Sequence, residues 1–161
     1  MLEFDKFSGV YKLTSKQWID ASLDEVWDYF SNPRNLQALT PDDLDFNILS
    51  NPSENMNEGD IITYKIQILP LIKTKWITEI KSVNTLRSFV DEQRTGPYKM
   101  WHHRHTFIAK DNGVLMTDEV HFMLPFGLLS RPFFPIFIQP KLKKIFEFRY
   151  LKVLEIFKQE Q

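Results

Sequence analysis

Two histidines spaced two residues apart, His103 and His105, are the side chains of this sequence best suited to acid–base or metal chemistry. An imidazole changes its charge near neutral pH, and its nitrogens can bind a metal ion. Alternate residues of a strand point to the same face, so both rings converge if residues 101–107 form a strand. Asp118 and Glu92 lie on neighbouring strand-like segments and offer carboxylates to this pair. The sequence therefore predicts a polar group of two imidazoles and two carboxylates.

Turn signals on both sides of this strand set its predicted register. If Asn112-Gly113 is a two-residue hairpin turn, Asp118 lies diagonally across from His105. If Gly96-Pro97 is the centre of the preceding turn, Glu92 shares their face. A one-residue change in either turn would exchange the faces. The face expected to point inward holds Val90, Glu92, Trp101, His103, His105, Phe107, Asp118, Val120, Phe122 and Leu124, and the face expected in water holds Asp91, His102, Arg104, Thr106, Glu119 and His121.

This polar group permits several interpretations, which the sequence leaves open. It can be a satisfied network that fixes the register of the sheet, or a polar floor that orients a ligand head group. Zinc or iron bound through His103, His105 and a carboxylate fits the residue types, but that face has no third histidine. We therefore expect no metal and no cofactor. His105 and Asp118 could also form a general acid–base pair, which makes them the candidate catalytic residues of an enzyme.

Composition and charge exclude several classes of protein. The 161 residues suit one domain, which we expect to span residues 1–161. Lys and Arg number 20 against 21 acidic residues, so no basic surplus exists to bind nucleic acid. Cysteine is absent, which excludes thiolate chemistry and disulfides. The first residues lack the build of a signal peptide, and no stretch approaches the about 20 apolar residues that cross a bilayer. We expect a cytoplasmic protein without stable membrane insertion.

Hydrophobic periodicity predicts strands through most of the chain and a helix at its end. Residues 10–19 alternate like a strand, a capping box at residues 22–25 begins a short helix, and Asn32-Pro33 begins a second one. Alternation then continues from residue 44 to residue 80, with a turn signal at Pro70. From residue 128 the pattern is helical but broken by prolines. The later part of this helix places Phe146, Arg149 and Val153 on its apolar stripe, which makes the arginine a natural counter-charge for the inward acids.

These elements predict an α+β fold in which a curved antiparallel seven-stranded sheet wraps around one long C-terminal helix, with two short helices between strands one and two. The helix is the only element long enough to cover the apolar face of the sheet. Fourteen Phe and four Trp exceed what one sheet–helix interface needs, so we expect a pocket between the two layers. The segment from Leu128 to Ile138 is expected to pack as a lid, with transient membrane contact as the alternative.

Several short motifs resemble the SRPBCC superfamily, which includes START lipid-transfer domains, the birch-pollen allergen and polyketide cyclases. The resemblance runs from about Tyr11 to Arg149 and is closest to a bacterial branch labelled cell-division-inhibitor-like. It implies a helix-grip fold with a deep hydrophobic cavity, no obligatory cofactor, and functions in carriage, sensing or catalysis. The proline-broken segment at residues 131–140 departs from the smoother helix of the branch. The motifs are residues 17–27, 35–36, 40–41, 91–93, 96–98, 101–107, 124–127 and 145–149.

The sequence thus favours a protein that binds a hydrophobic or amphipathic small molecule, such as a lipid, an isoprenoid or an aromatic polyketide. The alternatives are a cyclase or dehydratase that uses His105 and Asp118, and a regulatory protein-interaction module with a nearly closed cavity. The oligomeric state stays open. The expected ligand-binding residues are Tyr64, Trp76, Glu92, Trp101, His103, His105, Phe107, Asp118, Phe122, Phe146 and Arg149.

Overall fold

One antiparallel sheet forms the main layer of the computed structural model, which describes residues 1–69 and 72–158. Its eight strands lie in the order β1-β2-β8-β7-β6-β5-β4-β3. Each strand pairs in antiparallel fashion with its neighbours. The strands are β1 (Leu2–Phe7), β2 (Val10–Ile19), β3 (Asn47–Ile48), β4 (Ile61–Leu69), β5 (Ile72–Asn84), β6 (Ser88–Thr95), β7 (Met100–Lys110) and β8 (Gly113–Met123).

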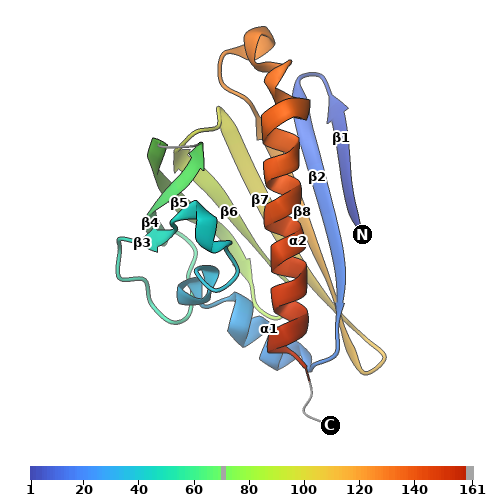
Figure 1. Cartoon of the computed structure of the whole chain (residues 1–161). Coiled ribbons are helices and arrows are strands. Elements are labelled where there is room, and N and C mark those ends of the chain that lie inside the picture. Colours follow the sequence, from blue (N-terminus) through green and yellow to red (C-terminus); the bar gives the residue numbers. More distant parts are fainter. Residues whose placement is uncertain (70–71, 159–161) are drawn as a thin grey trace.

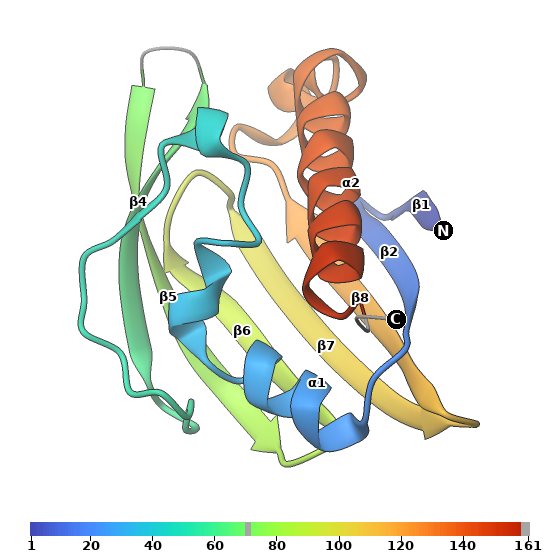
Figure 2. The ribbon, with the colours of Figure 1, turned by 60° about the horizontal axis from the view of Figure 1, so that its bottom comes forward.

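The long helix α2 (Gln139–Ile156) crosses the concave face of this curved sheet (Figures 1 and 2). Its buried residues are Leu142, Phe146 and Val153, which lie at helical spacing on the side that faces the strands. Gln17 on β2 fixes the helix further, because its amide donates a hydrogen bond of 2.9 Å to the carbonyl of Tyr150. This arrangement is the helix-grip fold, as the sequence predicted. No helix in residues 1–69 and 72–158 is long and apolar enough to cross a membrane.

Short helices connect β2 to β3 and close one side of the concave face (Figure 2). Helix α1 (Leu23–Phe30) begins at the expected capping box, in which Ser22 and Glu25 bond to each other's backbone. The 3₁₀ turn η1 (Pro33–Leu36) follows, with the Asn32 side chain accepting from the amide of Arg34. A second 3₁₀ turn, η2 (Asp42–Leu44), then leads toward β3.

The sequence underestimated the sheet by one strand. β1 pairs with β2 along its whole length through a tight turn at Ser8-Gly9, where both residues have positive φ angles. A Ser-Gly pair after the alternating residues 2–5 was the signal for this hairpin. The two short helices consequently lie between the second and third strands, not between the first and second. The strand expected at residues 44–48 is also reduced to Asn47–Ile48, and the turn expected at Pro70 lies outside the described residues.

Prolines break the helical segment before α2, as expected. Residues Gly127–Ser130 form the 3₁₀ turn η3, and Phe134–Ile138 form one π-helical turn, η4, that leads into α2. Pro140 has no N–H to donate to the carbonyl four residues earlier, which permits the wider turn. Phe134 anchors this segment to the sheet, with its ring centroid 4.1 Å from that of Tyr11.

The hairpin between β7 and β8 turns at Asp111-Asn112 and not at Asn112-Gly113. Asp111 has a positive φ of 50°, and Lys110 pairs with Gly113. Gly113 is required for a different reason, since a Cβ there would lie 2.6 Å from the carbonyl oxygen of Ile19 on β2. The strand register therefore moves by two residues from the expected one. A shift of two keeps every side chain on its predicted face.

Candidate functional site

The central strands bring two histidines and two aspartates together on the concave face. His105 lies directly opposite Asp118 in the β7–β8 pair, and His103 lies opposite Asp91 in the β6–β7 pair. Both histidines are buried, with 5 % and 6 % of their surface exposed. The inward orientation expected for both rings is thus confirmed.

The expected inward position of Glu92 is wrong, and Asp91 takes its place. The register of β6 against β7 differs by one residue from the one set by a turn centred on Gly96-Pro97. This difference exchanges the two faces of β6. Glu92 consequently pairs with His102 on the outer face, 2.8 Å from its Nδ1. Val90 also moves to the outer face, where it lies opposite Arg104. The side chain of Gln93 stabilises this loop, since its amide bonds to both the carbonyl and the N–H of Tyr98.

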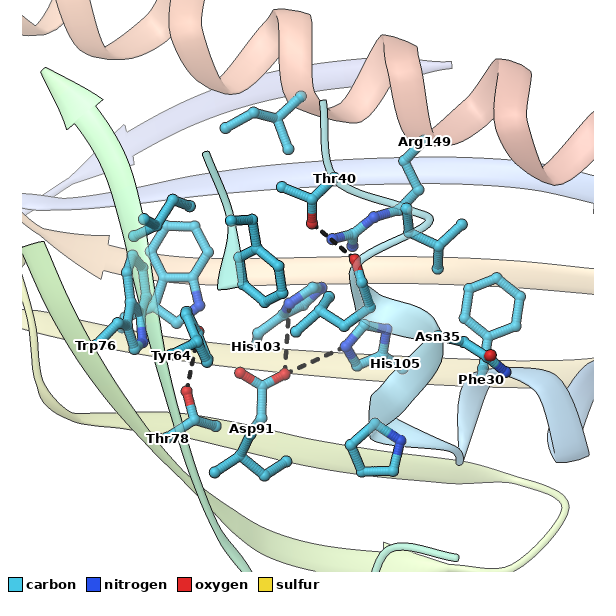
Figure 3. Close-up of a pocket in the computed structure, with 18 of the residues that line it drawn as sticks. Phe30, Asn35, Thr40, Tyr64, Trp76, Thr78, Asp91, His103, His105 and Arg149 are labelled. Carbon is cyan, nitrogen blue, oxygen red and sulfur yellow. Dashed lines mark hydrogen bonds and ion pairs between the residues drawn. The ribbon is translucent and has the colours of Figure 1, made fainter. Parts of the chain in front are cut away.

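The two carboxylates hold the two imidazoles from opposite ends. Figure 3 shows Asp91 with the two histidines. Asp118 Oδ1 lies 3.2 Å from Nε2 of His103 and 2.7 Å from Nδ1 of His105. Asp91 Oδ2 lies 3.5 Å from Nδ1 of His103 and 3.3 Å from Nε2 of His105. The ring centroids of the two histidines are 3.8 Å apart. We call these four residues the His–Asp cluster.

Burial and mutual charge set the protonation of this cluster. Burial alone would raise the pKa of Asp118, but the charge of His105 and the hydrogen bonds of both histidines hold it far below its usual value. The same balance lowers the pKa of Asp91. Burial would lower the pKa of His105, yet the charge and hydrogen bond of Asp118 raise it, whereas burial and repulsion from His105 lower the pKa of His103. The pKa shifts thus favour the charged form at His105 and the neutral form at His103.

A cavity of about 150 Å³ lies above the cluster, between the sheet, α2 and the segment of residues 29–46. Asp91, His103 and His105 line its floor, and Asp118 is shielded behind them. Its walls are mainly aromatic and aliphatic. This volume is close to that of cavities that admit one benzene-sized molecule, and it is smaller than a typical drug-sized site of about 300–1,000 Å³.

Arg149 reaches from α2 toward the two histidines (Figure 3). Its guanidinium carbon lies 5.0 Å from the ring centroid of Phe146, and its charge helps to lower the pKa of Asp91. Among the described residues, Nε of Arg149 and Nε1 of Trp76 are buried without a hydrogen-bond partner. Both residues line the cavity. Two N–H donors without acceptors favour an occupant that carries acceptor atoms.

The structure places most of the expected ligand-binding residues at this cavity, although not all. Phe107 belongs to the aromatic core with Trp27 and Phe30, and Phe122 stacks against Tyr11. The described residues of the expected lid, between residues 129 and 138, do not reach the cavity wall. The expected residues that do line it are Tyr64, Trp76, Trp101, His103, His105, Phe146 and Arg149.

Sequence reasoning missed Asp91 and the wall formed by residues 29–46. Asp91 was assigned to water because the register was taken from a turn centred on Gly96-Pro97, and the observed register differs from it by one residue. Phe89 and Val90 are both apolar, so the pattern of β6 itself gave no preference for either face. The available signal was the pair of histidines itself. Two buried imidazoles on one face need two carboxylate partners, and a second acid had to come from β6. Leu36, Leu39 and other residues of the wall come from turns without regular periodicity, and no pattern predicted their orientation.

Comparison with solved structures supports the fold. Protein Ms6760 from Mycobacterium smegmatis superimposes with a TM-score of 0.66 at 14% identity, over 97% of this chain and 98% of that one. The ginseng major latex-like protein 151 from Panax ginseng also gives 0.66, at 12% identity over 94% and 100%. A nucleoside-diphosphate sugar epimerase from Corynebacterium glutamicum gives 0.64 at 24% identity, over 88% of this chain but only 28% of that longer one. No family model and no curated protein matches the sequence.

Replacing Asp118 by Asn should destabilise the protein strongly, because it leaves the charge of His105 without its nearest partner in a buried site. Breaking such a pair costs about 3–5 kcal/mol. The matched control is Glu92→Gln, which disrupts a half-exposed carboxylate–histidine pair on the outer face of the same sheet and should cost less than about 1 kcal/mol. Urea unfolding followed by circular dichroism measures both free energies of unfolding. Equal losses in the two variants would contradict the account of the cluster.

Proposed function

We propose that the protein binds a hydrophobic or amphipathic small molecule in the cavity between the sheet and α2. The observation that carries this proposal is the combination of apolar walls with buried N–H donors that lack acceptors, on Trp76 and Arg149. Burial of apolar surface supplies affinity, at about 25 cal/mol per Å². The cationic side chain of Arg149 and the protonated His105 favour a ligand with an anionic or acceptor-bearing end.

Without movement of the protein, the cavity is large enough for about one ring of a ligand. A larger ligand requires the wall at residues 29–46 to separate from α2. This boundary is held by ion pairs of Asp43 with Lys144 at 2.8 Å and with Lys141 at 3.6 Å. Exposed ion pairs of this kind contribute little, at about 0–1 kcal/mol each. The ion pairs at this boundary therefore contribute little to keeping it closed, and the buried side chains of Leu44 and Leu142 are the apolar contacts that opening would expose.

Extraction of freshly purified protein with organic solvent, together with native mass spectrometry, tests the proposal most broadly. Binding is then measured with the fluorescent probe 1-anilinonaphthalene-8-sulfonate, which combines aromatic rings with an anionic group. Ile145 lines the cavity from α2, so Ile145→Trp should fill it and weaken probe binding by at least about tenfold, or 1.4 kcal/mol. Leu151→Trp, on an exposed position of the same helix, is the control and should bind like the unchanged protein. Equal weakening in both variants, or none in either, counts against a ligand in this cavity.

A second candidate is an enzyme of the cyclase or dehydratase type. The observation that favours it is the 2.7 Å contact of Asp118 with His105, which can hold an imidazole ready for proton transfer at the cavity floor. Conversion of the extracted compound by the unchanged protein, abolished in His105→Gln while binding is only weakened, would favour the enzyme over a carrier.

The finer assignments are part of the same proposal. We place the chain in the SRPBCC superfamily, in its cell-division-inhibitor-like branch, on the motifs of the sequence and the shared fold. We also propose that residues 1–161 act as one ligand-binding domain in the cytoplasm, where the absence of cysteine is compatible with a reducing environment.

We further propose that the segment between β8 and α2 contacts a lipid surface transiently. It projects beyond the end of the sheet (Figure 1) and exposes five large apolar side chains. Arg131, also exposed, and the 60 % exposed side chain of Lys143 add positive charge beside it, which suits an anionic surface. The exposed apolar residues are Phe126, Leu129, Phe133, Ile136 and Phe137.

Sedimentation with vesicles tests this contact. The protein should co-sediment with phosphatidylglycerol vesicles more than with phosphatidylcholine vesicles, and Phe137→Asp should reduce the bound fraction severalfold, since an inserted charge opposes burial of apolar surface. Leu151→Asp, which changes an exposed leucine on α2 away from this segment, is the control. Absence of sedimentation, or an equal reduction in both variants, contradicts the membrane contact.

A further inference from the structure

The His–Asp cluster places two imidazole nitrogens and one carboxylate oxygen around a common point at the cavity floor. His103 directs Nε2 and His105 directs Nδ1 to the shielded Asp118, which leaves the opposite nitrogen of each ring near Asp91. Nδ1 of His103 lies 3.5 Å and Nε2 of His105 lies 3.3 Å from Asp91 Oδ2. One donor atom from each of these three residues lies within 4.8 Å of the others.

The ring nitrogens of the two histidines do not all make hydrogen bonds: Nδ1 of His105 is buried without a well-aligned partner among the described residues, and Nδ1 of His103 has only a 3.5 Å contact with Asp91. An ionised carboxylate only accepts hydrogen bonds, so His103 Nε2 must donate to Asp118 at 3.2 Å. The other nitrogen of His103, Nδ1, meets Asp91 Oδ2 at 3.5 Å, which is too long for a good hydrogen bond. A metal ion between these atoms binds both, because an imidazole nitrogen and a carboxylate oxygen are each metal ligands.

We propose that Asp91, His103 and His105 bind a divalent transition-metal ion through this set of atoms. A tetrahedral ion with bonds of about 2.1 Å holds its donors about 3.4 Å apart, close to the two separations from Asp91. Asp118 is the outer carboxylate that orients both imidazoles, the role that such carboxylates have in histidine metal sites. Asp91, His103 and His105 all line the cavity, so the remaining coordination position faces it.

The donor set and the charge balance define what this site takes. Two imidazoles with one carboxylate suit Zn²⁺, Fe²⁺ and Co²⁺ better than Mg²⁺ or Ca²⁺, which prefer oxygen ligands. The ion binds the neutral form of His105 and therefore displaces the proton from its Nε2. The divalent ion and the guanidinium of Arg149 then exceed the two carboxylates by one positive charge. The open position therefore favours an anionic group. We expected no metal from the sequence because the inward face has no third histidine; in the structure, Asp91 supplies the third ligand instead.

The metal-free protein, prepared by treatment with a chelator, is titrated with cobalt(II) chloride and followed by its visible absorption. We expect saturation at one equivalent per chain and a raised temperature of unfolding. Asp91→Asn, which removes a ligand charge while keeping the side-chain shape, should weaken binding by at least about tenfold, and Asp118→Asn by about 10- to 100-fold. Calorimetric titration with zinc chloride should give the same order of affinities.

The matched control is His102→Gln. His102 lies near His121 and Glu92 on the outer face of the same strands, and these side chains are the group that could compete for cobalt. This variant should bind cobalt like the unchanged protein. Circular dichroism establishes that each variant folds. The binding stoichiometry of the unchanged protein tests the proposal on its own, even if a variant fails to fold. Failure to bind one equivalent, or loss of binding in His102→Gln while Asp91→Asn retains it, would overturn the proposal. The titration contains no organic ligand, so its outcome is separate from that of the proposed ligand binding.

Discussion

The balance of charge beneath α2 is the constraint on which the rest of this structure depends. The buried carboxylate of Asp118 and the mostly buried one of Asp91 are costly unless cations and hydrogen-bond donors compensate for them. The histidines on β7 and Arg149 on α2 supply this compensation from two layers of the fold. The register of β6, β7 and β8 is fixed by the same requirement, because a slip of one residue would move Asp91 or Asp118 away from its imidazole partners.

The same constraint explains why the layers do not close completely. Ordinary apolar packing would bring the sheet and helix into contact throughout, as happens around Val120 and Val153. Over the cluster, Arg149 and Trp76 keep polar atoms directed toward a cavity without giving them partners in the described chain. A solvent-filled or ligand-filled space satisfies such groups at lower cost than a dry core does. The cavity and the His–Asp cluster are therefore one feature.

Much of the fold could be predicted because its signals are local. The capping box at Ser22, the extent of β2 and the proline break before α2 all follow from the chemistry of neighbouring residues. The inward orientation of His103 and His105 was also predictable, because a two-residue shift in the β7–β8 hairpin keeps the faces unchanged. The identity of the second acid, Asp91, was not predictable in this way. It depends on the length of the loop at residues 96–98, where Gln93 replaces a simple turn by side-chain hydrogen bonds.

A crystal structure of the protein, at a resolution that shows ordered water, tests the central claim most directly. The account predicts Asp91 and Asp118 on opposite sides of the two buried imidazoles, with Arg149 directed into a space that holds water, an ion or an organic molecule. A sheet packed against α2 without any space, or Asp91 on the outer face with Glu92 inside, would contradict it.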